Sequence, residues 1–120
     1  MKIEVELNGR IYEIIGGELD LSHAEVTDLS SLKGLSLTKL FLDRTSVEDL
    51  SPLQDMPLVH LDIRDTLVTD LSPLEGMPLT HFYFSDTKVT SLLPLKGMPL
   101  IVLEFEDTPI KDLSPYKACH

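Results

Sequence analysis

The side chains of this 120-residue chain that could do chemistry lie at short and regular spacings. His60 and Asp62 are two residues apart, and His81 follows His60 by 21 residues. These three side chains could bind a metal ion if the fold brought them together, because His and Asp are common zinc ligands. No fourth ligand or enclosing shell of supporting residues is evident, however. We therefore expect no metal site and no cofactor.

The other potentially reactive groups, two carboxylates and one thiol, lack the surroundings that catalysis requires. Glu104 and Glu106 are spaced as a carboxylate pair, but no enclosing pocket is expected that would raise the pKa of either. Cys119 and His120 are a thiol and an imidazole at the chain end, where a nucleophilic pair is implausible. The sequence contains no Gly-rich phosphate loop and no hydrolase or kinase motif. We therefore expect a non-enzymatic protein with no catalytic residues.

The two histidines share a fixed spacing because the chain consists of copies of one segment. Leu58 to Pro78 reads LVHLDIRDTLVTDLSPLEGMP, and this segment returns with substitutions on both sides of itself. A fixed period of this length predicts a solenoid, one continuous domain made by stacking neighbouring units. The copies are five units of 21 residues without insertion, at residues 16–36, 37–57, 58–78, 79–99 and 100–120.

Each unit changes its hydrophobic period along its length. Residues 60–64 alternate polar and apolar side chains, which predicts a short strand with Leu61 and Ile63 facing inward. The later Asp-Leu-Ser-Pro-Leu segment predicts one turn of 3₁₀ helix, with Ser as its cap and Pro at its first position. A Gly such as Gly76 then ends the turn. We expect an α/β repeat array with a short parallel β-sheet on one face and 3₁₀ turns on the other.

Apolar residues occupy the same unit positions in successive copies, so we expect them to form interior columns. Leu dominates these columns, which predicts an aliphatic core. The column at the 17th unit position ends on Tyr116, and the column at the 20th ends on Cys119, which we interpret as a packed interior thiol. The column at the 14th position contains Leu29, Leu50, Leu71, Leu92 and Leu113.

Residues 1–15 form a different segment. Two alternating runs flank Asn8-Gly9, a dipeptide that supplies the two positive φ angles of a type I′ turn. Because the end of a stacked array exposes its core, we expect this β-hairpin to cap the first unit with its mostly apolar face. The expected cross-strand pairs are Leu7 with Arg10, Val5 with Tyr12 and Ile3 with Ile14.

The repeated pattern resembles a known family. That pattern is Leu58-x-x-Leu61-x-Ile63-x-x-Thr66-x-Val68-x-x-Leu71-x-x-Leu74. It is similar to the leucine-rich repeat, and its short Ser-Pro-Leu return is most similar to the bacterial, internalin-type class. The position that usually holds Asn or Cys in the family holds Thr here, and Ala24 in the first unit. A Thr hydroxyl can supply part of the bonding that the family's Asn gives to the backbone beyond the strand.

The resemblance implies that function lies on the concave face, the outward side of the strands. Phe41 and Tyr83 should lie two strands apart, roughly 10 Å from each other at the usual strand spacing, with Asp62 between them. His60 and His81 should be ladder neighbours about 5 Å apart. Exposed aromatic residues beside Arg are typical of protein-binding hot spots. The expected partner-binding residues are Lys39, Phe41, Arg44, His60, Asp62, Arg64, His81, Tyr83 and Glu104.

The charge of the chain limits its partners. Its 20 acidic and 10 basic residues give a formal net charge of −10, which repels nucleic-acid phosphates and anionic lipid headgroups. We therefore expect neither nucleic acid nor membrane as a partner. Towards the C-terminal end Glu104, Glu106, Asp107 and Asp86 concentrate negative charge, which favours a partner protein with a basic patch. The lack of a long apolar run predicts a cytoplasmic protein, unless the chain is a piece of a longer one. The resemblance to the bacterial, internalin-type class implies a bacterial or phage origin.

An alternative hypothesis is a structural or assembly unit that self-associates through its repeat ends or edges. The fifth unit has no separate capping segment, so its apolar side chains would leave an uncovered end. This unit could cap itself, stack against a second molecule, or be part of a longer repeat protein. We expect a monomer or a weak homodimer formed through the C-terminal repeat.

Overall fold

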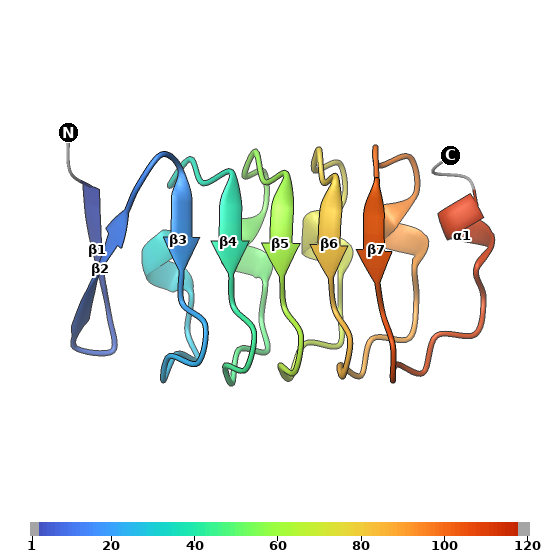
Figure 1. Cartoon of the computed structure of the whole chain (residues 1–120), viewed down its shortest axis with the longest axis horizontal. Coiled ribbons are helices and arrows are strands. Elements are labelled where there is room, and N and C mark those ends of the chain that lie inside the picture. Colours follow the sequence, from blue (N-terminus) through green and yellow to red (C-terminus); the bar gives the residue numbers. More distant parts are fainter. Residues whose placement is uncertain (1–2, 118–120) are drawn as a thin grey trace.

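Short parallel strands line one side of a row of coils, and a β-hairpin lies at one end of that row (Figure 1). The computed structural model describes residues 3–117, with side chains to residue 115. Within these residues, β1 and β2 form an antiparallel pair, and the other strands form a parallel sheet in the order β3-β4-β5-β6-β7. The elements are β1 (Ile3–Leu7), β2 (Arg10–Ile14), β3 (Glu18–Asp20), η1 (Ser30–Leu32), β4 (Lys39–Phe41), η2 (Ser51–Leu53), β5 (His60–Asp62), η3 (Ser72–Leu74), β6 (His81–Tyr83), η4 (Leu93–Leu95), β7 (Val102–Glu104) and α1 (Ser114–Lys117).

The hairpin has the turn and register that its sequence predicts. Asn8 and Gly9 have φ angles of 51° and 79°, the positive values that a type I′ turn requires. Leu7 and Ile14 are buried in the common core, so the apolar face of the hairpin covers the first coil. Asn8 Nδ2 also donates a hydrogen bond to the Glu25 carbonyl at 2.7 Å, which ties the hairpin turn to the first coil. The observed pairs include Leu7 with Arg10, Val5 with Tyr12 and Ile3 with Ile14.

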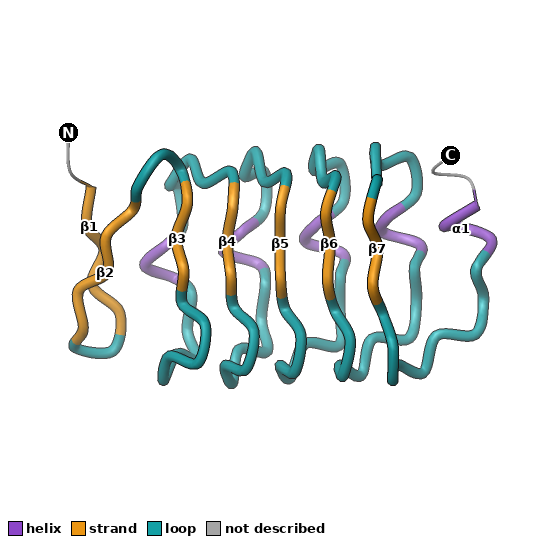
Figure 2. Tube along the Cα trace, in the orientation of Figure 1, coloured by secondary structure: helices purple, strands orange, loops and turns teal. Residues whose placement is uncertain are grey.

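Pairing in the parallel sheet joins residues that are one repeat apart. Leu40 pairs with Leu19 on one side and Leu61 on the other, each 21 residues away in sequence. Hydrogen bonding continues past the strand ends, since the Ile63 N–H donates to the Tyr83 carbonyl at 2.8 Å. Equivalent residues therefore form columns along the row of coils (Figure 2). The unit bounds themselves stay a prediction, because the coils follow one another without a structural break.

The chain leaves each strand of the parallel sheet through a turn with a left-handed residue. Arg44 and Asp65 have φ angles of 60° and 55° at this point, and Asp86 has 59°. The next residue closes the turn, because Thr66 Oγ1 donates to the Ile63 carbonyl at 2.8 Å. This bond supports the interpretation that Thr replaces the family's Asn. The Thr residues that make it are Thr45, Thr66, Thr87 and Thr108.

In η1, η2 and η3 an Asp two residues earlier, and not the predicted Ser, accepts the first N–H of the 3₁₀ turn, which corrects the sequence prediction. In η4 the Ser91 hydroxyl takes this place and accepts the Leu93 N–H at 3.1 Å. Asp49 Oδ1 accepts the Ser51 N–H at 2.9 Å, and Asp70 does the same for Ser72. Asp is favoured because a side chain two residues earlier can reach this N–H, as in an Asx-turn. Ser is consequently the first residue of the 3₁₀ turn and Pro the second. In the described residues, no helix has the length and hydropathy needed to cross a membrane.

An aliphatic core runs through the coils. Leu19, Leu40 and Leu61 are completely buried, and the column continues at Phe82. Leu113, which continues one of the interior columns, is 43% exposed, as expected from the uncovered end of the fifth unit. It lies in the last coil, and within residues 3–117 no further coil packs against it. The side chains of Tyr116 and Cys119, also expected in the interior, lie outside the described residues, as does His120.

Candidate functional site

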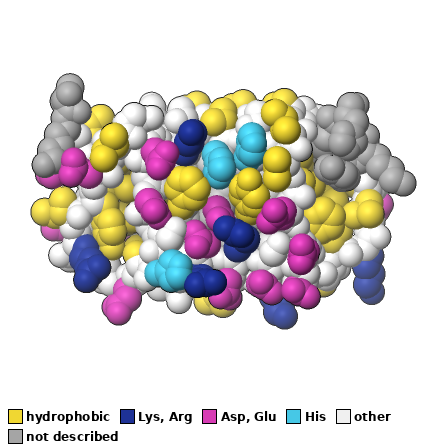
Figure 3. All heavy atoms as spheres, in the orientation of Figure 1, with side chains coloured by type: hydrophobic (Ala, Val, Ile, Leu, Met, Phe, Trp, Pro, Cys, Tyr) yellow, Lys and Arg dark blue, Asp and Glu magenta, His cyan; other side chains and the backbone are white. Residues whose placement is uncertain are grey.

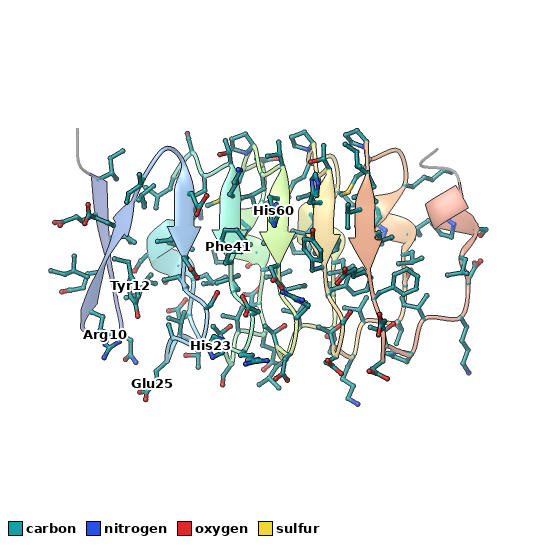
Figure 4. The ribbon with its side chains drawn as sticks, viewed as in Figure 1. Arg10, Tyr12, His23, Glu25, Phe41 and His60 are labelled. Carbon is teal, nitrogen blue, oxygen red and sulfur yellow. The ribbon has the colours of Figure 1, made fainter. Side chains whose placement is uncertain are left out.

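Aromatic side chains meet at the centre of the sheet face, the surface made by the outward-facing residues of β3 to β7. The His60 ring on β5 lies 5.0 Å from Phe41 on β4, measured between ring centroids. It lies 5.4 Å from both His81 and Tyr83 on β6. All four side chains are half-buried, and we call them the ring cluster. Figure 3 shows hydrophobic and His side chains gathered at the centre of this face, and Figure 4 shows Phe41 beside His60.

The parallel register explains the geometry of the ring cluster. His60 pairs directly with His81 in the sheet, and their rings are stacked with an interplanar angle of 6°. Phe41 and Tyr83 lie on the two sides of Asp62 in the same ladder, two strands apart as predicted. Strands in a sheet are spaced about 4.8 Å apart, so outward residues of one column are held in contact.

Asp62 is not accessible on the sheet face, which corrects the expectation of an exposed partner-binding carboxylate. Only 3% of this residue is exposed. Arg64, two residues along the chain, folds back over it and donates from Nη2 at 2.7 Å and from Nε at 3.0 Å. The pair leaves the carboxylate fully engaged, while the Arg64 side chain stays 46% exposed.

The Arg64 guanidinium connects this ion pair to the ring cluster. Its Cζ atom lies 5.4 Å from the Tyr83 ring centroid, a distance at which a cation is attracted to an aromatic face. The hydrogen bonds that Arg64 donates to the Asp62 carboxylate raise the pKa of Arg64 above its already high value. The side chain is therefore a permanent cation, held in place beside Tyr83.

Both histidines of the ring cluster have defined surroundings. Burial lowers the pKa of His60, and the neighbouring His81 and Lys39 lower it further. His81 Nδ1 lies 2.9 Å from Thr80 Oγ1, within hydrogen-bonding distance. The centre of the ring cluster is therefore an uncharged imidazole at neutral pH.

The other expected site residues lie around the ring cluster. Lys39 is exposed on β4, where it pairs with His60, and Glu104 is exposed on β7, where it pairs with Tyr83. Arg44 lies in the turn after β4 and, with Arg64, lines a hollow of about 220 Å³. The structure therefore brings all nine expected residues to the sheet face or to the turns that follow it.

Acidic residues flank the ring cluster on two sides. Glu18 and Asp20 are exposed on β3, and Glu104 and Glu106 are exposed at and after β7. The second flank is expected from the sequence, but the first is not singled out there. The β3 flank could have been found from the alternation of polar and apolar residues along the strand, which places Glu18 and Asp20 on the outward face.

A cleft between the hairpin and the first coil is not predicted from the sequence. It encloses about 680 Å³ and adjoins a smaller cavity of about 340 Å³. Arg10, Tyr12, His23 and Glu25 surround this region in Figure 4, and they come from β2 and from the turn after β3. A signal was present at Ala24, where the first unit departs from the Thr of the other units.

Metal binding finds no support in the part of the chain that the structure describes. Within it, no group of three His, Cys, Asp or Glu side chains is placed to hold a metal ion. His60 and His81 lie close together, but the Asp62 carboxylate is occupied by Arg64. We assign no residue of the described part to the binding of a cofactor.

Comparison with known proteins matches the chain to solved structures. No protein-family model matches, and no curated protein matches in sequence. Internalin C2 from Listeria monocytogenes is 35% identical with a TM-score of 0.81, over 84% of this chain and 46% of the internalin chain. An internalin (InlF) from the same organism is 27% identical with a TM-score of 0.77, over 82% of this chain and 30% of that one. The chain thus spans less than half the length of either structure.

The stacked coils, the parallel sheet and the 3₁₀ turns define a leucine-rich repeat protein. The shared fold and the identity over most of the chain place its repeats in the bacterial internalin type, which confirms the resemblance seen in the sequence.

Proposed function

We propose that this chain is a non-enzymatic module that binds a partner protein on its sheet face. The observation that carries the proposal is the ring cluster, in which apolar and aromatic rings are in mutual contact and only half-buried. Leucine-rich repeats of this type generally mediate protein–protein interaction, which agrees with this assignment. The cytoplasmic location expected from the sequence stays a prediction.

The ring cluster has the chemistry of an interaction hot spot. Hot spots are enriched in Tyr and Arg and lie near the centre of an interface, where surrounding contacts exclude water. Tyr83 and Arg64 are fixed by their mutual contact and by Asp62, so they lose little conformational entropy on binding. A partner that covers these rings would therefore gain apolar contact at a low ordering cost.

Charge favours a partner with basic residues around an apolar centre. The acidic flanks at β3 and β7 lie on the two sides of the ring cluster, and the whole chain has a formal charge of −10. Complementary charge increases the association rate and selects the orientation of a partner. Glu104 and Glu106 on one side and Glu18 and Asp20 on the other would be matched by two groups of Lys or Arg.

Capture of partners by a double variant tests the proposal. Phe41→Ala with Tyr83→Ala removes two rings of the cluster, and the matched control is Leu67→Ala with Leu93→Ala. The two control residues are 56% and 62% exposed and lie outside the strands of the sheet. Each protein is first verified as folded by circular dichroism and then used as bait in host lysate. We expect prey to be lost only with the ring variant; prey that persists on this variant and is lost with the control contradicts the proposal.

The second candidate function is an assembly unit that associates through its C-terminal repeat. The last coil favours it, because Ile101 is 75% exposed and Leu113 is 43% exposed. Glu104 and Glu106 on the same coil would oppose a symmetric contact through like-charge repulsion. Light scattering during size-exclusion chromatography tests this candidate. A dimer that dissociates on Ile101→Lys supports it, and a monomer at high concentration contradicts it.

A further inference from the structure

The cleft between the hairpin and the first coil contains charged groups that lie outside the ring cluster. Two of the three arginines in the chain are Arg10 and Arg44, and they belong to this region. Neither side chain forms an ion pair with another described residue. Arg64, by contrast, is paired with Asp62. Each of the two adjoining cavities is therefore lined by one cation that is available to a ligand, Arg44 in the larger and Arg10 in the smaller.

An acidic group that lacks a described side-chain partner lies in the same cleft. The Glu25 carboxylate is exposed and makes no hydrogen bond or ion pair with another described residue, although its backbone carbonyl accepts from Asn8. The other charged groups are already engaged. Asp28 accepts the Ser30 N–H at 2.9 Å, and His23 lies 3.8 Å from the Asp43 carboxylate. Free groups of both signs thus face one space.

The shape and lining of the cleft suit a small organic molecule. Its volume of about 680 Å³ is within the usual range of about 300–1,000 Å³ for ligand pockets. Leu7 and Val26 supply apolar surface in the larger cavity, and the half-buried Tyr12 ring lines the smaller one. Ala24 adds room, because the other coils carry a larger Thr at this position. The apolar part of a ligand could therefore pack against these apolar side chains while its charged groups meet the charged residues of the cleft.

We propose that this cleft binds a small zwitterion, an α-amino acid or a short peptide. Its carboxylate is held by the guanidinium group of Arg44, whose planar fork matches carboxylate geometry and which lines the larger cavity together with Glu25. Arg10 adds positive charge from the adjoining cavity. The ammonium group of the ligand is held by the Glu25 carboxylate. A zwitterion fits better than a simple anion because the net charge of −10 repels anions, whereas a neutral molecule with both charges is not repelled. This site lies outside the ring cluster and does not depend on partner binding there, although Arg44 is also one of the nine expected partner-binding residues.

Titration of the isotope-labelled chain, followed by NMR of the backbone amides, tests the proposal. The first probe is an equimolar mixture of the standard L-amino acids. L-phenylalanine is then compared with two analogues, phenylpropionate, which lacks the ammonium group, and phenethylamine, which lacks the carboxylate. We expect saturable shifts at the amides of residues 23–25 and 44–46, and at least tenfold weaker binding of both analogues. Absence of saturable shifts with the mixture overturns the proposal, and so does equal binding of phenylpropionate, which would indicate an anion site.

Variants separate the site from general surface charge. Arg10→Gln with Arg44→Gln is expected to weaken binding of the best amino acid at least tenfold, and Glu25→Gln is expected to weaken it as well. The matched control, Lys88→Gln with Lys96→Gln, removes two exposed cations elsewhere and is expected to leave the affinity unchanged. Amide spectra and thermal unfolding verify that each variant is folded. An equal loss in the control would overturn the proposal, as would shifts confined to the ring cluster.

Discussion

The hydroxyl of Thr66 shows how one side chain fixes the turn after a strand. Its Oγ1 donates to the Ile63 carbonyl at 2.8 Å, and Thr66 itself is only 6% exposed. Thr66→Val keeps the shape and leaves a buried carbonyl without this donor, so we expect a loss of about 1–2 kcal/mol in the free energy of unfolding. Urea denaturation measures the loss. The exposed Thr69→Val should change stability little, and an equal effect at the two positions would contradict the assignment.

A second prediction at the residue scale concerns the pH dependence of His60. Its pKa is lowered in the fold, mainly by burial, so the unfolded chain binds the proton at a higher pH than the folded chain. The stability that His60 contributes is therefore present above its unfolded pKa of about 6.5 and is lost as pH falls through that value towards the folded pKa. We expect the melting-temperature difference between the wild type and His60→Gln to decrease from pH 7.5 to pH 5.5. A constant difference would show that His60 is not desolvated.

Side-chain types and spacing predict the membership of the ring cluster but not the state of every member. Alternation along residues 60–64 is enough to put His60 outward, and the 21-residue period is enough to put it beside His81. The burial of Asp62 is not predictable in the same way. It depends on Arg64 folding back along its own strand, a choice of side-chain conformation that the period does not determine. The cleft is missed for a similar reason, since its walls come from the docking angle of the hairpin.

At the scale of elements, the hairpin turn tolerates few residue types, because its backbone is left-handed at Gly9. Gly9 has a φ of 79°, and a Cβ added there meets no atom within 4 Å, so the constraint is in the backbone alone. Gly9→Val should cost about 1–2 kcal/mol, because a β-branched residue is strained in the left-handed region. Gly9→Asn should cost much less, since Asn tolerates this region. Chemical denaturation compares the two, and equal losses would argue against backbone strain as the cause.

The repeated coil is the element that sequence predicts best. Equivalent positions in the coils have similar residue types and similar surroundings. A misleading residue in one copy is therefore outweighed by the pattern of the other copies. The coils differ from one another where a copy has no neighbour or a different neighbour, as expected for the two end units. Leu113 is exposed in the last coil, and Ala24 in the first coil lines the cavities that Leu7 and Asn8 of the hairpin also line. The Asp caps of η1, η2 and η3 were missed because Ser and Asp are both good capping residues, and only geometry decides between them.

At the scale of the whole molecule, stability should depend on how many neighbours a coil has. Leu61 is completely buried in the central strand, whereas Leu113 is 43% exposed in the last coil. Leu61→Ala should therefore cost about 2–5 kcal/mol in unfolding free energy, the usual range for a core cavity. Leu113→Ala should cost less than about 1 kcal/mol, because less buried surface is removed. Urea unfolding of the two variants measures the difference, and equal losses would contradict a core that weakens at its end.

The central claim is that the sheet face is the surface that binds a partner protein. Isothermal titration of the captured partner into the wild type, the Phe41→Ala, Tyr83→Ala variant and the Leu67→Ala, Leu93→Ala control tests it most directly. Loss of one hot-spot aromatic typically costs about 2 kcal/mol or more. We therefore predict that the ring variant binds at least about 30-fold more weakly, while the control binds as the wild type does. Unchanged affinity of the ring variant would contradict the account and move the functional surface to the ends of the repeat array.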